Sequence, residues 1–484
     1  MIVASMVLVP VFIGIICLFI SDVRWLSRFS VLGAVVSLIV ALYCCVPLLT
    51  GTALNESIWY IDGLSGFFLT ITAVISFVAL IYSKDYMSGE YEEGVLSAKD
   101  LRNYYFFMFI FISAILFTFA VRSAALTWIG IGATTLISAF LVGMYKDRRS
   151  TEAAWKYIML CSVGITLALF GIALLFAAST NVIPDESSLD WPALVEKALD
   201  LNPVLMKFAA AFFIIGLGIK AGFAPLHNWL PDAHGQAPSP VSAMMSGVLL
   251  NCAMYGIMRF YSLSEVVNPE FARNILLFFG IISLVVSSAF ILISKDLKKM
   301  LAYSSIENMG LIAIGLGIGT PMALFAAMFI VLAHSICKPL IFFCAGDLIQ
   351  AYDTRIMSDI RGVSKKMRFS GLATTAGGLA VAGAPPFPLF IGELLLIAGA
   401  LGAGMYAVAA FLAIMLIIVF AGLIMHIAPM LSGSTDKDVK DVRSPLRMAS
   451  IAILIAMAVF FGLFMPDQLK GIIDGIVLIL SGGA

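Results

Sequence analysis

The stretch Gly216-Leu-Gly-Ile-Lys220-Ala-Gly-Phe-Ala-Pro225 interrupts an apolar run that extends from residue 204 to residue 230. Proline removes a backbone donor and clashes with the preceding turn, so a helix should break at Pro225. Backbone groups freed by such a break are tolerated at membrane depth only beside protein or water. The stretch therefore predicts a discontinuous membrane helix, if the rest of the chain lies in a bilayer.

The composition of the whole chain places it in a bilayer. Of its 484 residues, 61% are hydrophobic and 12% are charged, and the mean hydropathy is +1.05. A globular surface needs more charge than this, which excludes a soluble enzyme and a secreted scaffold. The 29 basic and 29 acidic residues balance, so no net positive field would attract a nucleic acid. The predicted fold class is an all-α polytopic membrane protein.

Apolar runs of roughly 20 residues, the length that crosses the hydrocarbon core, recur along the chain. The first run lacks a basic start and a small-residue cleavage pattern, so we expect a spanning helix rather than an export signal. The tail from Asp467 is expected to be interfacial or half-inserted. About fourteen spans are predicted, near residues 2–20, 29–50, 63–83, 104–121, 124–145, 156–178, 204–230, 239–263, 272–293, 298–319, 321–345, 370–401, 404–430 and 446–464.

A second interrupted run contains Gly383-Ala-Pro385-Pro386-Phe-Pro388, followed by Gly392-Glu393. The two breaks fall in the seventh and twelfth predicted spans, and this odd offset predicts two five-helix units of opposite topology. Paired broken helices in inverted repeats are typical of an ion or substrate path at the midplane. The alternative is that these glycines and prolines only adjust helix packing.

We expect one membrane domain, residues 1–484, without a soluble module. Its predicted parts are the N-terminal helices (1–103), a first repeat of helices 4–8 (104–263), a second repeat of helices 9–13 (272–430) and a C-terminal helix with its tail (446–484).

The basic residues are distributed unequally between the predicted loops. Of the 29, 21 follow odd-numbered spans, six follow even-numbered spans or lie in the tail, and Lys220 and Lys338 lie inside apolar runs. Because basic loops resist translocation, the odd loops should face the cytoplasm and the N-terminus the outside. We therefore expect a multi-pass protein of a prokaryotic plasma membrane.

The seven cysteines all lie in apolar runs and show no CxxC spacing. This pattern favours small residues packed between helices over disulfides, an iron–sulfur cluster or structural zinc. The sequence also has no phosphate-binding glycine motif and no nucleophile elbow. We expect no cofactor, no metal and no catalytic redox centre in this chain.

Ionisable residues inside apolar runs are the candidate functional groups, since a charge in the bilayer is costly. Lys220, beside the first break, is expected to exchange protons where water reaches it, with a structural cation as the alternative. Glu393 is its counterpart in the second broken run, with a hydrogen-bonded neutral acid as the alternative. His334 and Lys338 are four residues apart and share a helix face, which suggests a proton-relay step.

Two further polar groups are secondary candidates. Ser304 and Glu307, near the basic run Lys295–Lys299, either admit water from the cytoplasmic side or satisfy a helix terminus. His227, Asp232 and His234 follow the first break and are predicted to form a loop at the membrane face, with a structural role favoured over a functional one.

The run from Gly216 to His234, followed by Ala237-Pro-Ser-Pro-Val-Ser242, resembles the proton-translocating antiporter-like subunits. These occur in respiratory complex I, in Mrp cation/proton antiporters and in membrane-bound energy-converting hydrogenases. The run Asp296–Ser305 and the helix with His334 and Lys338 carry the same resemblance, which covers nearly the whole chain. The runs Glu152–Tyr157 and Cys161–Gly164 most resemble the component F branch of hydrogenase-4 and formate hydrogenlyase-type complexes.

The resemblance implies a midplane path of charged residues and water, to which Lys220, His334, Lys338 and Glu393 match by motif. Two positions depart from the family pattern. Gly132 stands where the family has a glutamate that partners the helix-seven lysine, and Asn251 stands where many relatives carry a lysine.

Two hypotheses follow from these departures. In the first, the path conducts protons, with Gly132 making room for water. In the second, the input half is impaired, and the subunit is partly a scaffold or relies on a neighbour's carboxylate.

The expected function is that of an antiporter-like subunit of a redox-driven complex that translocates H⁺, with exchange of Na⁺ left open. A stand-alone Mrp-type Na⁺/H⁺ antiporter component and a non-conducting scaffold are the alternatives. The expected partners are other membrane subunits, the bilayer and these ions, and no nucleic acid.

Overall fold

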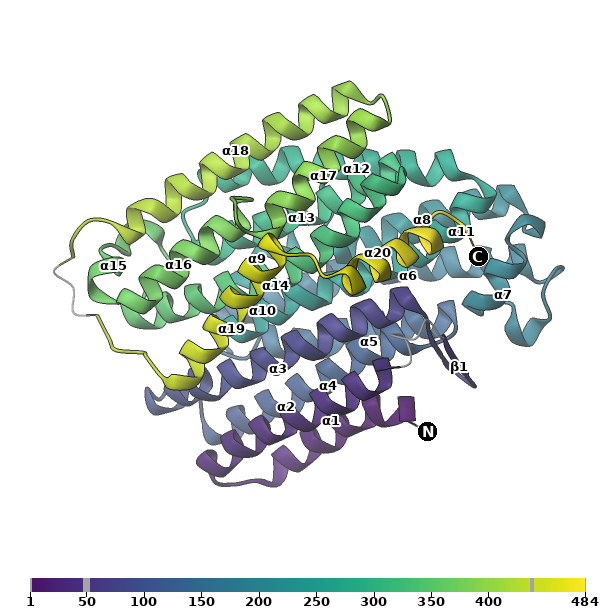
Figure 1. The fold of residues 1–484 in the computed structure, drawn as a ribbon. Helices are drawn as coiled ribbons and strands as arrows, with labels where there is room; N and C mark the ends of the chain where they lie inside the picture. Colours follow the sequence, from purple (N-terminus) through teal and green to yellow (C-terminus); the bar gives the residue numbers. More distant parts are fainter. Residues whose placement is uncertain (1, 47–52, 436–438, 484) are drawn as a thin grey trace.

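The computed structural model describes residues 2–46, 53–435 and 439–483, and nearly all of them are helical (Figure 1). Within these ranges, twelve helices are long and apolar enough to cross a membrane. They are α2 (Val23–Cys45), α3 (Gly63–Glu92), α4 (Ala98–Ala120), α5 (Ala124–Val142), α6 (Arg148–Ser179), α8 (Pro203–Ala221), the continuous helix Ser239–Val267, α12 (Pro269–Ile293), α13 (Leu297–Ile318), α14 (Pro321–Tyr352), α18 (Tyr406–Leu431) and α19 (Pro445–Leu463).

Shorter elements complete the described fold. The continuous helix Ser239–Val267 consists of α10, a π-helical turn at Met245–Leu249, and α11. A small antiparallel hairpin, β1 with β2, precedes α3. The shorter elements are α1 (Ile2–Phe19), β1 (Leu54–Glu56), β2 (Trp59–Ile61), α7 (Trp191–Glu196), α9 (Trp229–Gln236), α10 (Ser239–Met244), α11 (Leu250–Val267), α15 (Val363–Lys366), α16 (Arg368–Val381), α17 (Pro388–Gly402), α20 (Asp467–Leu480) and 3₁₀ turns at Asp185–Ser187, Ala198–Asp200 and Met357–Asp359.

The predicted all-α polytopic fold class is confirmed. Each predicted apolar run coincides with a helix or with a pair of half-helices, and α1 and α17 are the two shorter apolar helices. Residues 47–50 of the second predicted span, and Lys437 of a predicted loop, lie outside the described residues. The division into two inverted repeats stays a prediction.

The first predicted break is confirmed, between α8 and α9. α8 ends at Ala221, and Gly222 follows with a φ of +84°, in the left-handed region that favours glycine. Pro225 lies in the connecting segment, where its missing N–H costs no helical hydrogen bond. The indole of Trp229, the first residue of α9, donates to the carbonyl of Ile219 (2.8 Å) and holds the two half-helices together.

The second predicted break is confirmed as well, between α16 and α17. α16 ends at Val381, and Gly383 in the connecting segment has a φ of +70°. α17 begins at Pro388, a position where proline is well tolerated because the first helical N–H groups have no partner in the helix.

The predicted loop at His227, Asp232 and His234 is wrong for two of these residues. Asp232 and His234 lie in α9, and His234 is fully buried, whereas His227 lies in the connecting segment. The chain returns to a helix this soon because Pro231 falls in the first turn of α9, where it does not break the helix.

The interior of the bundle is formed by three long helices. In its most apolar window, the helix Ser239–Val267 is 100% buried, and α13 and α14 are each 94% buried. The corresponding value is 28% for α18 and for α19, which therefore present most of their apolar side chains outward. Helices that are hydrophobic all round belong in a core. The ionisable residues of the three inner helices are thus removed from lipid.

The C-terminal helix α20 lies along this core. It contacts α14, α11 and α3, and its residues Ile473, Ile476 and Leu480 are fully buried. In Figure 1 it runs across the middle of the bundle, and the described chain ends near α11. Its predicted interfacial or half-inserted position stays a prediction.

Candidate functional site

Lys220 lies in the last turn of α8, immediately before the first break, and is fully buried. Its ammonium donates to the hydroxyl of Tyr157 on α6 (3.1 Å) and to the hydroxyl of Thr135 on α5. Tyr157 is in turn hydrogen-bonded to Ser138 on α5 (2.8 Å). The lysine therefore lies among hydroxyl groups, each of which can both donate and accept a hydrogen bond.

Gly132 lies near Lys220 in the fold, at the position where the resemblance to antiporter-like subunits predicts a glutamate. No ion pair found between described residues includes Lys220. Gly132 lies one turn before Thr135 on α5, and a Cβ built there would meet only Ile165, at 4.0 Å. The position that could supply a carboxylate is thus vacant and has room for a longer side chain.

Lys338 forms the centre of a second cluster, in the middle of α14. It is fully buried and donates to the carbonyl of Leu301 (3.1 Å) and to the hydroxyl of Ser304, both on α13. Glu307, one turn beyond Ser304, is its electrostatic partner. Because Asp296 already caps α13, Ser304 and Glu307 do not serve the helix terminus. The structure brings both of these secondary candidates to Lys338.

His334 lies one turn before Lys338 and belongs to the same cluster. Its Nε2 is 3.5 Å from the hydroxyl of Ser246, which is hydrogen-bonded to Ser305 (2.8 Å). Ser246 lies in the π-helical turn Met245–Leu249, a local irregularity that is frequent at functional sites. Among the described residues, the buried Nδ1 of His334 has no hydrogen-bond partner. The ring therefore keeps one open hydrogen-bonding position.

Asn251 lies on α11, between the two lysine clusters. Its side-chain amide donates to Ser335 on α14 (2.8 Å) and to the carbonyl of Gly247 (2.9 Å). The next residue, Cys252, is an electrostatic neighbour of Lys220. α11 therefore borders one cluster with Asn251 and the other with Cys252. An amide can hydrogen-bond on this boundary but cannot change its charge.

Glu393 extends the second cluster to the second break. It lies in the second turn of α17 and is 7% exposed. Its carboxylate lies directly against Gly383, so that a Cβ added at this glycine would overlap it. Glu307 is its electrostatic neighbour. The charged groups Lys338, Glu307 and Glu393 thus follow one another from the middle of α14 to the broken helix.

The candidates on α9 point to different environments. Asp232 forms ion pairs with Lys299 (2.7 Å) and Lys156 (3.3 Å), in a partly exposed group. His234 is buried and stacked on Phe342 of α14, with ring centroids 5.1 Å apart. Neither of its ring nitrogens has a hydrogen-bond partner among the described residues. Asp232 therefore stands apart from the buried clusters, whereas His234 lies beside them.

Several basic residues that were assigned to loops from the sequence are buried in the structure, or lie inside a predicted span. Lys298, assigned to a cytoplasmic loop, is 3% exposed in the first turn of α13 and donates to the carbonyl of Ala237 (2.6 Å). Arg259 and Arg447 are each 4% exposed. Adjacent residues such as Lys298 and Lys299 point to different sides of a helix, and Arg259 falls inside a predicted span. Both features of the sequence could have indicated that Lys298 and Arg259 are buried.

The buried Arg259 has a structural partner. Its guanidinium forms two hydrogen bonds of 2.6 Å with Asp62, the N-cap of α3, and one of 3.0 Å with Tyr255. Burial alone would raise the pKa of the Asp62 carboxyl, but Arg259 and the Ser65 amide hold this pKa below its usual value. This bidentate pair ties α3 to α11.

Two family models match the chain. The model described as "NADH:quinone oxidoreductase/Mrp antiporter, TM" matches residues 121–421, and that described as "NADH-Ubiquinone oxidoreductase (complex I), chain 5 N-terminus" matches residues 56–94.

Curated relatives come from hydrogenase and quinone-reductase complexes. A "Hydrogenase-4 component F homolog" of Methylacidiphilum infernorum is 34% identical over 470 residues, which are 96% of this chain and 97% of the relative. "NADH-quinone oxidoreductase subunit N" of Desulforudis audaxviator is 29% identical, over 73% of this chain and 68% of the relative. "Hydrogenase-4 component B" of Escherichia coli is 31% identical, over 69% of this chain and 49% of the relative.

Solved structures share the fold over almost the entire chain. A chain of the archaeal membrane-bound sulfane sulfur reductase superimposes with a TM-score of 0.87 and 21% identity, over 99% of this chain and 98% of its own length. A chain of the Mrp complex from Dietzia sp. gives 0.84 and 18%, over 100% and 99%. A chain of respiratory complex I from Thermus thermophilus gives 0.78 and 22%, over 98% and 99%.

Proposed function

The chain belongs to the family of antiporter-like membrane subunits of NADH:quinone oxidoreductase and Mrp antiporters, and from this premise we propose that it conducts protons through its buried charged residues. The proposed path comprises Lys220, His334, Lys338 and Glu393, with Glu307 and Asn251 beside it. The observation that best supports this path is the position of its members. Lys220 and Glu393 flank the two helix breaks, and the remaining groups lie on the inner helices between them.

The proton step at Lys220 depends on its hydroxyl neighbours. An ammonium in the bilayer interior is costly, so a proton that reaches Lys220 is retained only while polar groups stabilise it. Thr135 and Tyr157 accept the ammonium's hydrogen bonds, and Tyr157 continues to Ser138. A neutral amine at Lys220 accepts a proton from this side, and the ammonium releases it when that stabilisation weakens.

The second cluster offers an acid and a base on either side of one lysine. Glu307 stabilises the ammonium of Lys338 when the carboxylate is charged, and this support is lost when Glu307 is protonated. His334, one turn away, keeps an open ring nitrogen for the proton that Lys338 releases. A change in the charge of Glu307 in turn alters the electrostatic environment of Glu393.

The proposed assembly is a redox-driven, energy-converting complex of the hydrogenase or formate hydrogenlyase type. It is supported by the similarity to the hydrogenase-4 component F homolog, which spans both chains almost completely. Other membrane subunits of that complex are the proposed partners. H⁺ is the proposed ion, and an Mrp-type exchange of Na⁺ for H⁺ is the competing assignment.

Proton uptake by vesicles that contain the assembled complex tests this function. The complex is driven by its redox substrates, and uptake is followed with a pH-sensitive dye for Lys220→Ala and Glu393→Gln. The matched controls are Lys207→Ala, an exposed lysine on the same helix α8, and Glu270→Gln, an exposed glutamate on α12. We expect uptake to be lost in the first pair and kept in the controls. Uptake that is unchanged in both path variants would reject the proposal.

A second candidate, an impaired input half, is favoured by one observation. Lys220 has no carboxylate partner among the ion pairs of the described residues, and the space at Gly132 is open. Gly132→Glu would restore the carboxylate, and Gly132→Gln is a control of equal size without its charge. If the input is impaired, uptake rises only in Gly132→Glu; if the path conducts already, neither variant gains.

A further inference from the structure

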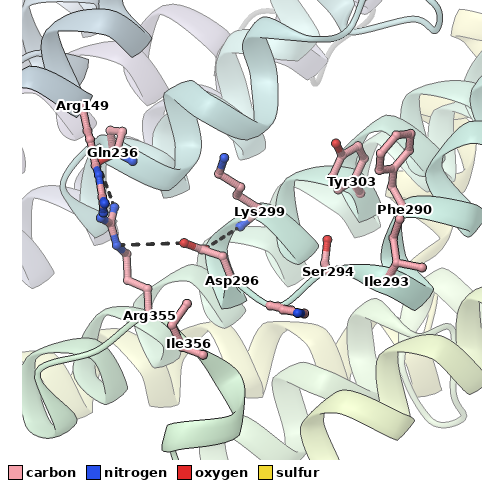
Figure 2. Close-up of a pocket in the computed structure, with 11 residues that line it drawn as sticks. Arg149, Gln236, Phe290, Ile293, Ser294, Asp296, Lys299, Tyr303, Arg355 and Ile356 are labelled. Atoms are coloured by element: carbon pink, nitrogen blue, oxygen red, sulfur yellow. Dashed lines mark hydrogen bonds and ion pairs between the residues drawn. The ribbon is translucent and has the colours of Figure 1, made fainter.

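A cavity of about 470 Å³ opens at the N-terminal end of α13 (Figure 2). Segments that are distant in sequence build its wall: the start of α6, the ends of α9 and α12, the start of α13 and the turn before residue 357. A volume of this size is typical of sites for small ligands. The cavity is not part of the proposed proton path.

Basic side chains dominate the polar part of this wall. A single carboxylate, that of Asp296, lies among them, and Asp232 just outside neutralises Lys299 in part (2.7 Å). The four basic residues that line the cavity are Arg149, Lys295, Lys299 and Arg355.

These cations combine fixed and unpaired groups. The Arg355 guanidinium donates to the carbonyl of Gly235 and to the side chain of Gln236 (3.0 Å), which fixes it against the end of α9. Arg149 and Lys295 are exposed and enter no ion pair found between described residues. Guanidinium and ammonium groups that surround one space suit a phosphate, whose oxygens accept several charge-assisted hydrogen bonds.

The opposite wall is apolar, as Figure 2 shows for Phe290, Tyr303 and Ile293. The rings of Phe290 and Tyr303 stack with centroids 4.8 Å apart, and Ile293 at the end of α12 is 68% exposed. An exposed isoleucine at the end of a membrane helix is suited to contact lipid chains. The cavity therefore has one wall for an anion and one for hydrocarbon.

We propose that this cavity binds the phosphate of an anionic phospholipid headgroup, whose acyl chains lie along the end of α12. Basic pockets between membrane helices on the cytoplasmic side recognise such headgroups, and the cavity lies on the predicted cytoplasmic side. The bound headgroup bridges α6 and α9 on one side to α12 and α13 on the other. It thereby holds α9, the second half of the first broken helix, in place. This site does not depend on the proposed proton conduction.

Native mass spectrometry of the complete complex tests the site. The complex is exchanged into micelles that contain phosphatidylglycerol or phosphatidylcholine, and retained lipid is counted. The site variant is Arg149→Gln with Lys295→Gln, and the control is Lys365→Gln with Lys366→Gln, two exposed lysines outside the cavity. We expect the wild type and the control to retain one phosphatidylglycerol, with a preference of about tenfold over phosphatidylcholine. The site variant should lose this preference. Equal retention by site variant and control would overturn the proposal.

Two further arms keep the result decisive. Lys295→Gln alone removes an exposed side chain outside every ion pair found in the described ranges, so it tests the site if the double variant does not assemble. Millimolar inorganic phosphate is the second arm. If it displaces phosphatidylglycerol completely and binds as well by itself, the ligand is free phosphate and the lipid assignment is wrong. We expect it to displace the lipid only weakly.

Discussion

Lys220 is solvated by hydroxyl groups, at a place where the resemblance to antiporter-like subunits predicts a carboxylate. A buried cation costs free energy unless polar groups surround it, and here Thr135 and Tyr157 are those groups. Hydroxyls stabilise an ammonium less than a carboxylate does, but they also accept and donate the proton that moves. Removal of either hydroxyl should therefore lower the rate of proton transport more than its effect on the free energy of unfolding would suggest.

Thr135→Val removes one of these hydroxyls and keeps the shape of the side chain. A missing hydrogen bond to a charged group costs about 1.5–3 kcal/mol, which corresponds to proton uptake slowed by about tenfold or more. Thr134→Val is the control, because that hydroxyl is equally buried and donates to the carbonyl of Ile131 (2.7 Å). Uptake is measured in vesicles for both. Equal rates in the two variants would show that Thr135 plays no part.

Gly383→Ala tests the contact between the second break and Glu393. Both this variant and Gly404→Ala place an alanine at a positive φ, +70° and +71°, which costs about 1–2 kcal/mol in each. A Cβ at Gly383 also overlaps the Glu393 carboxylate, whereas nothing lies within 4 Å of a Cβ at Gly404. We expect Gly383→Ala alone to lose proton uptake. Similar uptake in the two variants would contradict a role for this contact.

At the scale of elements, the fold depends on half-helices and on ties between helices. Length and apolar composition predicted the spans, because a segment in lipid must pair its backbone N–H and C=O groups internally, as a helix does. The prolines predicted both breaks. The burial of His234 could not be predicted in this way. It depends on how α9 packs against α14, where His234 stacks on Phe342, and this contact has no local pattern.

Asp62→Asn tests the tie between α3 and α11. The substitution leaves the charge of Arg259 buried without a counter-ion, which typically costs about 3–5 kcal/mol. Thermal unfolding in detergent should show a clear loss of stability. In Asp441→Asn, which opens an ion pair with both side chains about 60% exposed, we expect no resolvable change. A Tm for Asp62→Asn that equals the wild-type value would show that the tie is dispensable.

At the scale of the whole molecule, the candidate path draws on seven helices: α5, α6, α8, α11, α13, α14 and α17. The sequence could name Lys220, His334, Lys338 and Glu393, since each is an ionisable group in an apolar run or beside a break. It could not bring Thr135 to Lys220 or Ser304 to Lys338, because those residues lie on different helices, 85 and 34 positions apart, and their contacts depend on how the helices pack. The basic cavity escaped prediction for the same reason.

The distribution of basic residues predicts that the N-terminus faces outward. Glu186→Cys lies on the predicted outer side and Ser358→Cys on the cytoplasmic side, and both positions are exposed in the wild type. All seven native cysteines are buried, so their background reaction should be low. A membrane-impermeant maleimide added to whole spheroplasts should label only the Glu186→Cys chain. Labelling of only the Ser358→Cys chain would reverse the predicted orientation.

In the proposed path, one chain of buried groups carries the proton, and Lys338 is one of its two inner members. The most direct test is the number of protons taken up per electron pair by vesicles that contain the complex with Lys338→Met. Lys365→Met, an exposed lysine, is the control, and electron transfer is recorded in the same sample. We expect this ratio to fall in Lys338→Met and to stay at the wild-type value in Lys365→Met. A wild-type ratio in Lys338→Met would contradict it.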